Sequence, residues 1–151
     1  MENRFEIFST SVTHLVKTLQ LLKSRKMAQY DLKGTTCLCL CQILASENGL
    51  TASELSVKGD IDKAQVSRCM SELIEKGFAC REDENGRRYK QRYLLTDAGR
   101  VAAHDIVKTT NRIQDLAEGG ISHEELAAFY RVLDRMCDNF EMLREQISED
   151  E

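Results

Sequence analysis

One stretch of the sequence decides the fold, and it reads Asp62-Lys63-Ala64-Gln65-Val66-Ser67-Arg68-Cys69-Met70. In a helix that turns about 100° per residue, Val66, Met70 and Leu73 fall on one side. That side is apolar, and the opposite side is polar. The stretch therefore predicts an amphipathic helix that packs its apolar side against a core.

Both ends of this helix are marked. Asp62 is a natural N-cap, and Gln65, three residues later, completes a capping box. Gly77 supplies the left-handed residue that stops a helix. We therefore expect a helix from about Lys63 to Lys76.

The polar side of this helix carries residue types that bind DNA. In the major groove Gln can make two hydrogen bonds to adenine and Arg two to guanine, whereas Lys and Ser suit phosphate oxygens. We predict that Gln65 and Arg68 read bases and that Lys63 and Ser67 bind phosphates. The full set of predicted DNA contacts on this helix is Lys63, Ala64, Gln65, Ser67, Arg68 and Ser71. The alternative is a plain solvated helix, because polar faces are common.

A second, shorter helix precedes this one. Thr51 and Glu54 form a capping box that opens a helix through Leu55. The turn Lys58-Gly59-Asp60 ends that helix, and Ile61 is expected to fill the core behind the turn. Two short capped helices joined by a Gly-containing turn are the outline of a helix-turn-helix.

A basic hairpin follows at once. Residues 78–81 and 89–95 read as strands, and Asn85-Gly86 is a strong turn signal between them. The hairpin contains four basic residues without an intervening acid: Arg87, Arg88, Lys90 and Arg92. Arginines at the tip of a narrow hairpin can enter a minor groove. We predict DNA contacts from Arg87, Arg88 and Lys90; the alternative is an ordinary charged sheet edge.

These motifs together resemble the multiple antibiotic resistance regulator (MarR) family. The resemblance covers residues 51–100 and is carried by Asp62 to Arg68, Leu73, Lys76-Gly77-Phe78, Arg81, Asp83, Arg87-Arg88 and Leu95 to Arg100. It implies a dimeric winged-helix transcription factor, most often a repressor that a small ligand or thiol oxidation releases from DNA. The chain departs from the family at Gly86, where the family usually has an Asp that orients the wing.

The two ends of the chain predict a partner. Apolar residues recur every three or four positions near the N-terminus, at Phe5, Phe8, Val12, Leu15, Leu19 and Leu22. The same spacing recurs near the C-terminus, behind a capping box at Ser122-His123-Glu124-Glu125, at Leu126, Phe129, Leu133, Met136, Phe140, Leu143 and Ile147. We expect these helices to form an isologous homodimer, although packing within one chain is the alternative. The two DNA-reading helices of such a dimer, about 34 Å apart, would select a pseudo-palindromic operator.

We therefore expect a mainly α protein with a small β-wing, forming a single domain over residues 1–151. A winged helix-turn-helix of about residues 33–95 would be flanked by dimerisation helices of about 1–30 and 96–151. Thr96 is a plausible N-cap for a connecting helix that Gly119-Gly120 separate from the last one. Such a helix would couple the dimer interface to the spacing of the two DNA-reading helices. A ligand that changes the angle between these elements would therefore weaken simultaneous binding to two half-sites.

The net charge of −4 is unevenly distributed. Between Lys58 and Arg92 there are nine basic and seven acidic residues, so this segment is slightly positive and the remainder is distinctly negative. The asymmetry would orient the protein on a duplex. We expect modest non-specific affinity that falls steeply as salt rises.

Six cysteines occur, at Cys37, Cys39, Cys41, Cys69, Cys80 and Cys137. If Thr35 or Thr36 caps a helix through Leu44, the first three cannot converge on one metal ion. Most are expected to be small buried residues, and a disulfide framework is unexpected in a reducing cytosol. Cys69 differs because it borders the DNA-reading face, so a thiol-based redox sensor is an alternative function. The peroxide-sensing branch of the family carries its cysteine in the first helix, and this chain has none before Cys37.

Ligand and cofactor signals are sparse. His14, Tyr30 and His104 are expected, by family architecture, to line a small-molecule site between the reader and the dimer helices. The three histidines are too scattered to predict a metal site. No apolar stretch reaches the roughly 20 residues of a membrane span, and no secretory signal pattern is present, so we expect a cytoplasmic protein.

Enzymatic motifs do not occur in the sequence: it has no nucleophile elbow, no phosphate-binding Gly loop and no paired His/carboxylate motif. We therefore expect no enzymatic activity and no cofactor. A winged helix that binds protein instead of DNA is a further alternative, because Glu72 and Glu75 lie beyond Arg68 on the same helix.

Overall fold

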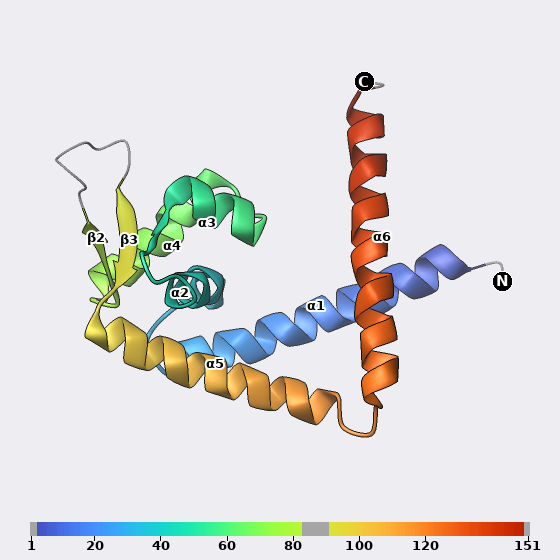
Figure 1. Ribbon diagram of the computed structural model, residues 1–151, viewed down its shortest axis with the longest axis horizontal. Helices are drawn as coiled ribbons and strands as arrows, with labels where there is room; N and C mark the ends of the chain where they lie inside the picture. The colour runs from blue at the N-terminus through green and yellow to red at the C-terminus, as the bar shows by residue number, and fades with distance from the viewer. Residues whose placement is uncertain (1–2, 83–90, 150–151) are drawn as a thin grey trace. The chain divides into compact units, whose positions relative to one another are not determined.

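The computed structural model describes residues 3–82 and 91–149 (Figure 1). The chain forms two compact units, residues 1–111 and residues 112–151, and each is considered by itself. The first unit contains helix α1, the helix-turn-helix with its small sheet, which we call the reader, and most of α5. The second unit contains the end of α5 and α6. The fold is mainly helical with one small sheet, as the sequence predicts, and that sheet has three strands.

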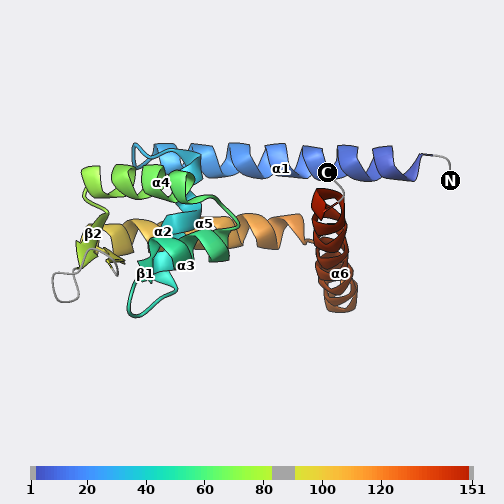
Figure 2. The same ribbon diagram turned by 90° about the horizontal axis from the view of Figure 1, so that it is seen from above.

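Helix α1 (Arg4–Ala28) is the long N-terminal element of the first unit. Its last turn holds Arg25 and Lys26, which suit the negative end of the helix dipole. The helices and strands of the reader gather around this C-terminal end (Figure 2). Asp31, at a φ of +56°, turns the chain away from α1.

A single 3-10 turn, η1 (Gly34–Thr36), leads into α2 (Cys37–Leu44). Here the predicted cap is wrong, because neither threonine side chain caps α2. The Thr36 hydroxyl instead donates to the Lys33 carbonyl at 2.6 Å. The 3-10 turn supplies the entry to the helix in place of a side-chain cap. Helix α2 then buries Leu40 and Ile43 in the core.

Helix α3 (Ala52–Gly59) begins with the predicted capping box. The Thr51 hydroxyl accepts from the Glu54 N–H at 3.2 Å, and the Glu54 carboxylate accepts from the Thr51 N–H at 2.7 Å. The helix ends at Asp60, whose φ of +48° is left-handed. A 2.6 Å hydrogen bond from the Ser56 hydroxyl to the Ile61 carbonyl fixes the turn that follows.

Helix α4 (Lys63–Glu75) is the predicted DNA-reading helix, with Lys76 as its C-cap. The Asp62 carboxylate caps it by accepting from the Gln65 N–H at 2.7 Å. Gly77 follows with a φ of +76°, as predicted. Both ends are therefore set by residues within a few positions of the helix.

The sheet has the order β1-β3-β2 and is antiparallel throughout. Strands β2 (Ala79–Glu82) and β3 (Arg92–Leu95) are the described parts of the predicted hairpin. The third strand, β1 (Leu50–Thr51), was not predicted. It pairs Thr51 with Arg92, and so joins the start of α3 to the hairpin.

Helix α5 (Asp97–Ala117) starts beside the end of α4. The predicted cap at Thr96 is present: its hydroxyl accepts from the Gly99 N–H at 3.0 Å and donates to the Gly77 carbonyl at 2.7 Å. Gly99 lies so close to the hairpin that an added Cβ would stand 1.8 Å from the Phe78 carbonyl oxygen. This contact requires a glycine.

One apolar core unites the first unit. Side chains from α1, α2, α3, α4, the sheet and α5 are fully or almost fully buried in it, and the largest are Met27, Leu40, Leu55, Met70, Leu73 and Ile106. Burial of each such side chain contributes about 1.5–3 kcal/mol. The core therefore holds α4 rigidly from behind.

The second unit is built on α6 (His123–Glu149). Its predicted capping box is present, because the Ser122 N–H donates to the Glu125 carboxylate at 2.9 Å and the Ser122 hydroxyl accepts from the Glu125 N–H at 3.3 Å. The Tyr130 hydroxyl donates to Glu118 at 2.9 Å. This bond ties the first turns of α6 to the segment after α5.

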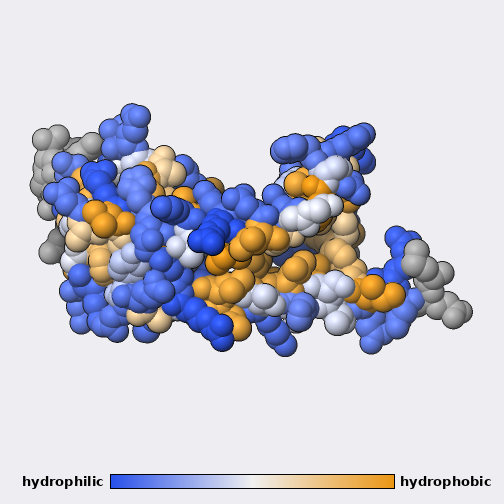
Figure 3. All heavy atoms as spheres, turned by 90° about the horizontal axis from the view of Figure 1, so that it is seen from below, coloured by the Kyte–Doolittle hydropathy of each residue, from blue (hydrophilic) through white to orange (hydrophobic). Residues whose placement is uncertain are grey.

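Many apolar side chains of the terminal helices are exposed. On α1 the exposed fraction is 76% for Phe5 and 57% for Leu15, and on α6 it is 53% for Phe129 and 64% for Ile147. Figure 3 shows apolar side chains, in orange, reaching the surface among hydrophilic ones. Within the described residues, no helix is both long enough and apolar enough to cross a membrane.

Candidate nucleic-acid interface

The two sides of α4 differ sharply in burial. Val66, Met70 and Leu73 are completely buried. The predicted DNA contacts that the structure exposes to solvent on this helix are Lys63, Ala64, Ser67, Arg68 and Ser71. We call these five residues the reading face. The helix thus presents a polar surface whose position is fixed by the core beneath it.

Gln65, the sixth predicted contact on α4, is half-buried at the edge of the reading face. Its side-chain oxygen accepts from the Arg68 guanidinium at 2.8 Å, and its nitrogen donates to the Cys69 sulfur at 3.4 Å. The capping box predicted between Asp62 and Gln65 is therefore formed only in its first half, because the Gln65 side chain is directed elsewhere. To read adenine with both groups, Gln65 must release these two partners.

A hollow of about 690 Å³ borders the C-terminal half of α4. Its lining includes three members of the reading face together with acidic side chains: Ala28, Asp31, Leu32, Lys33, Ser67, Arg68, Ser71, Glu72, Glu75 and Lys76. Two of these acids, Asp31 and Glu72, make structural contacts. Asp31 pairs with Lys76, and this contact lowers the pKa of Asp31. Glu72 accepts from the Lys33 N–H at 3.0 Å. These contacts anchor α4 to the segment that follows α1.

The predicted wing contacts lie in the part of the hairpin that the structure does not describe. Arg87, Arg88 and Lys90 lie outside the described residues. Arg81, on β2, is exposed, and its guanidinium carbon lies 5.7 Å from the centre of the Tyr93 ring. Such a cation–π contact keeps the charge at the surface.

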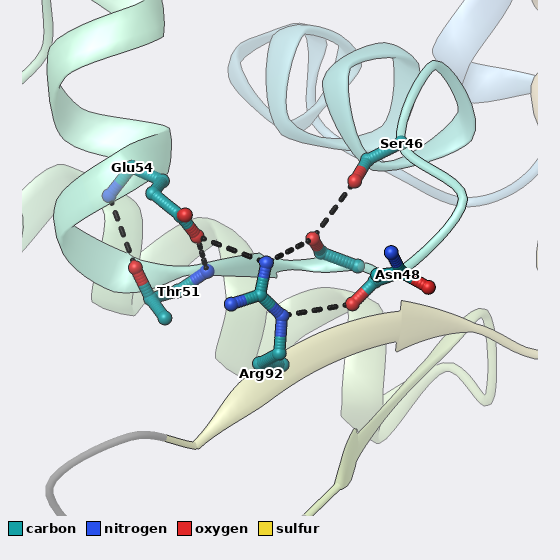
Figure 4. A network of polar contacts seen from close by, with 6 residues as sticks. Ser46, Asn48, Thr51, Glu54 and Arg92 are labelled. Carbon is teal, nitrogen blue, oxygen red and sulfur yellow. Dashed lines mark hydrogen bonds and ion pairs between the residues drawn. The ribbon is translucent and has the colours of Figure 1, made fainter.

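Arg92, which the sequence groups with the basic wing, instead faces the helix-turn-helix (Figure 4). Its guanidinium donates to the carbonyls of Asn48 at 2.8 Å and Gly49 at 3.2 Å, and it lies 3.6 Å from the Glu54 carboxylate. Glu54 also caps α3 through Thr51. Arg92 therefore locks the root of the hairpin to the start of α3. Sequence reasoning missed this role because it depends on the pairing of β1 with β3.

The three predicted effector-site residues are not brought together within the chain. His14 lines a shallow hollow of about 300 Å³ on α1 with Ser9, Thr10, Thr13 and Lys17. Tyr30 lies sixteen positions further along, which corresponds to roughly 24 Å of helix. His104 is exposed on α5.

Tyr30 belongs to a polar cluster that joins the end of α1 to α5. Its hydroxyl donates to the Asp105 carboxylate, and this bond raises the pKa of Tyr30 to about 12. The Lys26 ammonium lies 2.6 Å from the same carboxylate and lowers the pKa of Asp105. The Tyr30 ring meets the Phe78 ring edge to face, with the centroids 6.0 Å apart.

A third hollow, of about 520 Å³, opens beside the N-terminal half of α4. It is lined mainly by apolar surface from α1, η1, α2 and α4, and its residues are Gln20, Lys23, Ser24, Gly34, Thr35, Leu38, Ile61 and Gln65. We call it the Gln65 hollow. Sequence reasoning did not identify it, because its residues are spread over 46 positions and no motif links them.

The cysteines divide by location. Cys37, Cys39 and Cys69 are buried, Cys41 is half-buried, and Cys80 and Cys137 are exposed. Cys69, the predicted redox residue, lies inside α4 with 1% of its surface exposed. Among the described residues no cluster of His, Cys, Asp or Glu is arranged to hold a metal ion.

The chain was compared with family models, with curated proteins and with solved structures. No family model matches the sequence, and no curated protein matches it either. Solved structures do match. The transcriptional regulator SlyA superposes with a TM-score of 0.81 at 20% identity, covering 93% of this chain and 98% of that one. A MarR transcriptional regulator from Methanosarcina mazei Go1 gives 0.78 at 19% identity, covering 91% and 99%.

One similar structure contains DNA. It is a putative MarR family transcriptional regulator from Listeria monocytogenes complexed with a 26-mer DNA, with a TM-score of 0.79 at 15% identity and 86% of each chain covered. In this chain the matched architecture consists of the helix-turn-helix, the small antiparallel sheet and the flanking helices. This chain therefore has the winged helix-turn-helix fold of the MarR family transcriptional regulators.

Proposed function

We propose that this chain is a sequence-specific regulator of transcription that binds double-stranded DNA through α4. The observation that carries the proposal is the reading face, which is exposed and polar on a helix whose other side is wholly buried. A helix held in this way suits the B-DNA major groove, which is about 12 Å wide. A neighbour of the same fold that was solved as a complex with a 26-mer DNA supports DNA binding by this fold.

Within this proposal each residue has a role. Arg68 reads guanine and Gln65, once released from its present partners, reads adenine, while Lys63 and Ser67 hold phosphates. Ala64 and Ser71 complete the contact surface. On sequence grounds, Arg87 or Arg88 enters the minor groove and Lys90 binds phosphate.

We further propose that the DNA-binding form is a homodimer. The exposed apolar side chains of α1 and α6 support it, because a large apolar surface of this kind marks an interaction site. We propose that a second copy of the chain covers this apolar surface, because a closed two-fold dimer pairs the same surface of both copies. Two readers about 34 Å apart would then recognise a pseudo-palindromic operator.

We propose that the protein represses transcription and that a small ligand relieves this repression. The Gln65 hollow supports such an effector, because its volume of about 520 Å³ lies within the usual range for ligand sites and Gln65 lines it. A ligand bound there would contact a residue that is proposed to read bases.

Selection from a pool of random duplexes tests the proposal. The reduced full-length chain is incubated with the pool at low salt, and retained duplexes are sequenced after several rounds. We expect an inverted repeat whose half-site centres are about 10 base pairs apart. Failure to retain any duplex would contradict DNA binding and would favour a winged helix that binds protein.

A further inference from the structure

A chain of three hydrogen bonds runs from η1 into the reading face. The Thr35 carbonyl accepts from the Cys69 thiol, and the Cys69 sulfur accepts from the Gln65 side-chain amide, each at 3.4 Å. The Gln65 side-chain oxygen then accepts from the Arg68 guanidinium at 2.8 Å. Only 1% of Cys69 is exposed, whereas Arg68 is open to solvent. A buried thiol is therefore linked to the exposed residue that is proposed to read guanine.

The chemistry of these groups fixes the direction of the chain. A guanidinium has only donors, so the Gln65 amide must turn its oxygen toward Arg68. The amide nitrogen then points to the Cys69 sulfur, and the thiol proton is left for the Thr35 carbonyl. Turning the amide around would set donors against donors at Arg68. Gln65 is therefore held in one orientation.

This orientation favours one base contact over the other. Arg68 uses one of its five N–H donors on Gln65, so the others can bond guanine O6 and N7 without any existing bond being broken. Gln65 needs both its oxygen and its nitrogen to read adenine, and both are engaged. Reading adenine therefore costs both of these hydrogen bonds, and reading guanine costs neither.

We propose that Cys69 and Gln65 are positioning residues that make α4 favour guanine over adenine. Gln65 holds the Arg68 guanidinium in place, and Cys69 holds Gln65. Removing the Cys69 sulfur frees the Gln65 amide, which weakens guanine reading by Arg68 and strengthens adenine reading by Gln65. This role rests on the proposed function, because it requires α4 to read bases.

Base analogues in the selected operator test this role. Single guanines are replaced with 7-deazaguanine and single adenines with 7-deazaadenine, each of which lacks the N7 acceptor. The loss of affinity that each analogue causes is its penalty. In C69A we expect the guanine penalty to be about two- to threefold smaller than in the unmodified chain and the adenine penalty to be about two- to threefold larger, because hydrogen bonds to sulfur are weak. C69S keeps a donor and an acceptor at this position and should restore both penalties.

Two further variants separate this role from a general effect on folding. Q65A removes the group that holds Arg68, so its guanine penalty should fall as in C69A and its adenine penalty should vanish. Because Gln65 is only half-buried, Q65A gives an answer even if C69A fails to fold. C37A is the matched control, since Cys37 is also a buried thiol of the reader but lies on α2. C37A should keep both penalties of the unmodified chain.

The hold of Cys69 on Gln65 can also be measured without DNA. In isotope-labelled protein the NMR signal of the Gln65 side-chain amide is identified by its absence in Q65A, and its proton exchange with water is followed. We expect exchange to be faster in C69A than in the unmodified chain. Exchange in C69S and in C37A should stay as slow as in the unmodified chain.

Two results would overturn the proposal. The guanine penalty could stay unchanged in both C69A and Q65A, or the Gln65 amide could exchange equally fast in the unmodified chain and in C69A. If the unmodified chain binds no duplex at all, the proposed function fails and the base preference fails with it. The amide exchange still decides whether Cys69 holds Gln65.

Discussion

Arg68 is the residue on which the proposed base recognition depends most. One of its terminal nitrogens donates to the Gln65 oxygen at 2.8 Å, and the side chain is otherwise open to solvent. Arg68→Ala should weaken binding to the selected operator by about 1–3 kcal/mol, roughly 5- to 150-fold, because a bidentate contact to guanine is lost. Fluorescence anisotropy measures this change.

Arg112→Ala is the matched control for Arg68→Ala. It removes the same charge from an exposed position on α5 and should leave operator affinity nearly unchanged. Thermal unfolding should show that both variants fold like the parent. Equal losses of affinity in the two variants would mean that Arg68 contributes only general positive charge.

We predict that the stability of the contact between α1 and α5 depends on pH through Tyr30. Its hydrogen bond to Asp105 raises its pKa from 10.0 to about 12. Because the folded pKa exceeds the unfolded one, this bond stabilises the fold fully below about pH 10 and its contribution is lost as the pH rises through 12. Spectrophotometric titration should show a late phenolate transition that Tyr30→Phe removes. In Asp105→Asn the transition should move toward pH 10; a Tyr30 transition already near pH 10 in the parent would disprove the contact.

At the scale of elements, Gly99 fixes how α5 starts against the hairpin. Gly99→Ala would place a Cβ 1.8 Å from the Phe78 carbonyl oxygen, so the backbone must move. Gly77→Ala is the comparison: its Cβ meets nothing within 4 Å, and only the φ of +76° is unfavourable. We expect Gly77→Ala to cost about 1–2 kcal/mol and Gly99→Ala clearly more. Urea unfolding measures both, and equal costs would contradict the close approach.

The elements that sequence predicts best are those fixed by local hydrogen bonds. The caps at Thr51, Asp62, Thr96 and Ser122 are all present, because each requires only residues three positions apart. Strand β1 was not predicted, since its two residues pair with β3 across about forty positions of chain. Short elements of this kind are formed by their partners and carry little signal of their own.

The candidate site shows the same division. The exposure of Lys63, Ser67 and Arg68 follows from helical periodicity, which the sequence contains. The inward role of Arg92 and the partners of Gln65 depend on which elements meet in space. Periodicity along one helix has no information about such contacts.

At the scale of the whole molecule, the proposed homodimer is the feature that would make recognition of a two-part operator possible. Leu15 on α1 is 57% exposed in the single chain. Leu15→Asp should convert a dimer of about twice 17.2 kDa into a monomer of that mass, because a carboxylate cannot be buried unpaired in an apolar interface. Sedimentation equilibrium measures the mass.

Thr18→Asp is the control for the dimer, since Thr18 is a polar, exposed residue of the same helix. It adds the same charge and should leave the mass at the dimer value. Operator affinity should fall only in Leu15→Asp, because a monomer can bind one half-site at a time. A parent chain that sediments as a monomer would contradict the proposed assembly.

The exposed side of α4 is proposed to read base edges in the major groove, and one substitution in the DNA tests this most directly. Single guanines of the selected operator are replaced with 7-deazaguanine, which lacks the N7 acceptor, and the unmodified chain is compared with Arg68→Ala. We predict that one guanine per half-site weakens binding of the unmodified chain by about 1–3 kcal/mol and has no effect on Arg68→Ala. Equal losses of affinity in both proteins, or no effect of any guanine on either, would contradict base reading by α4.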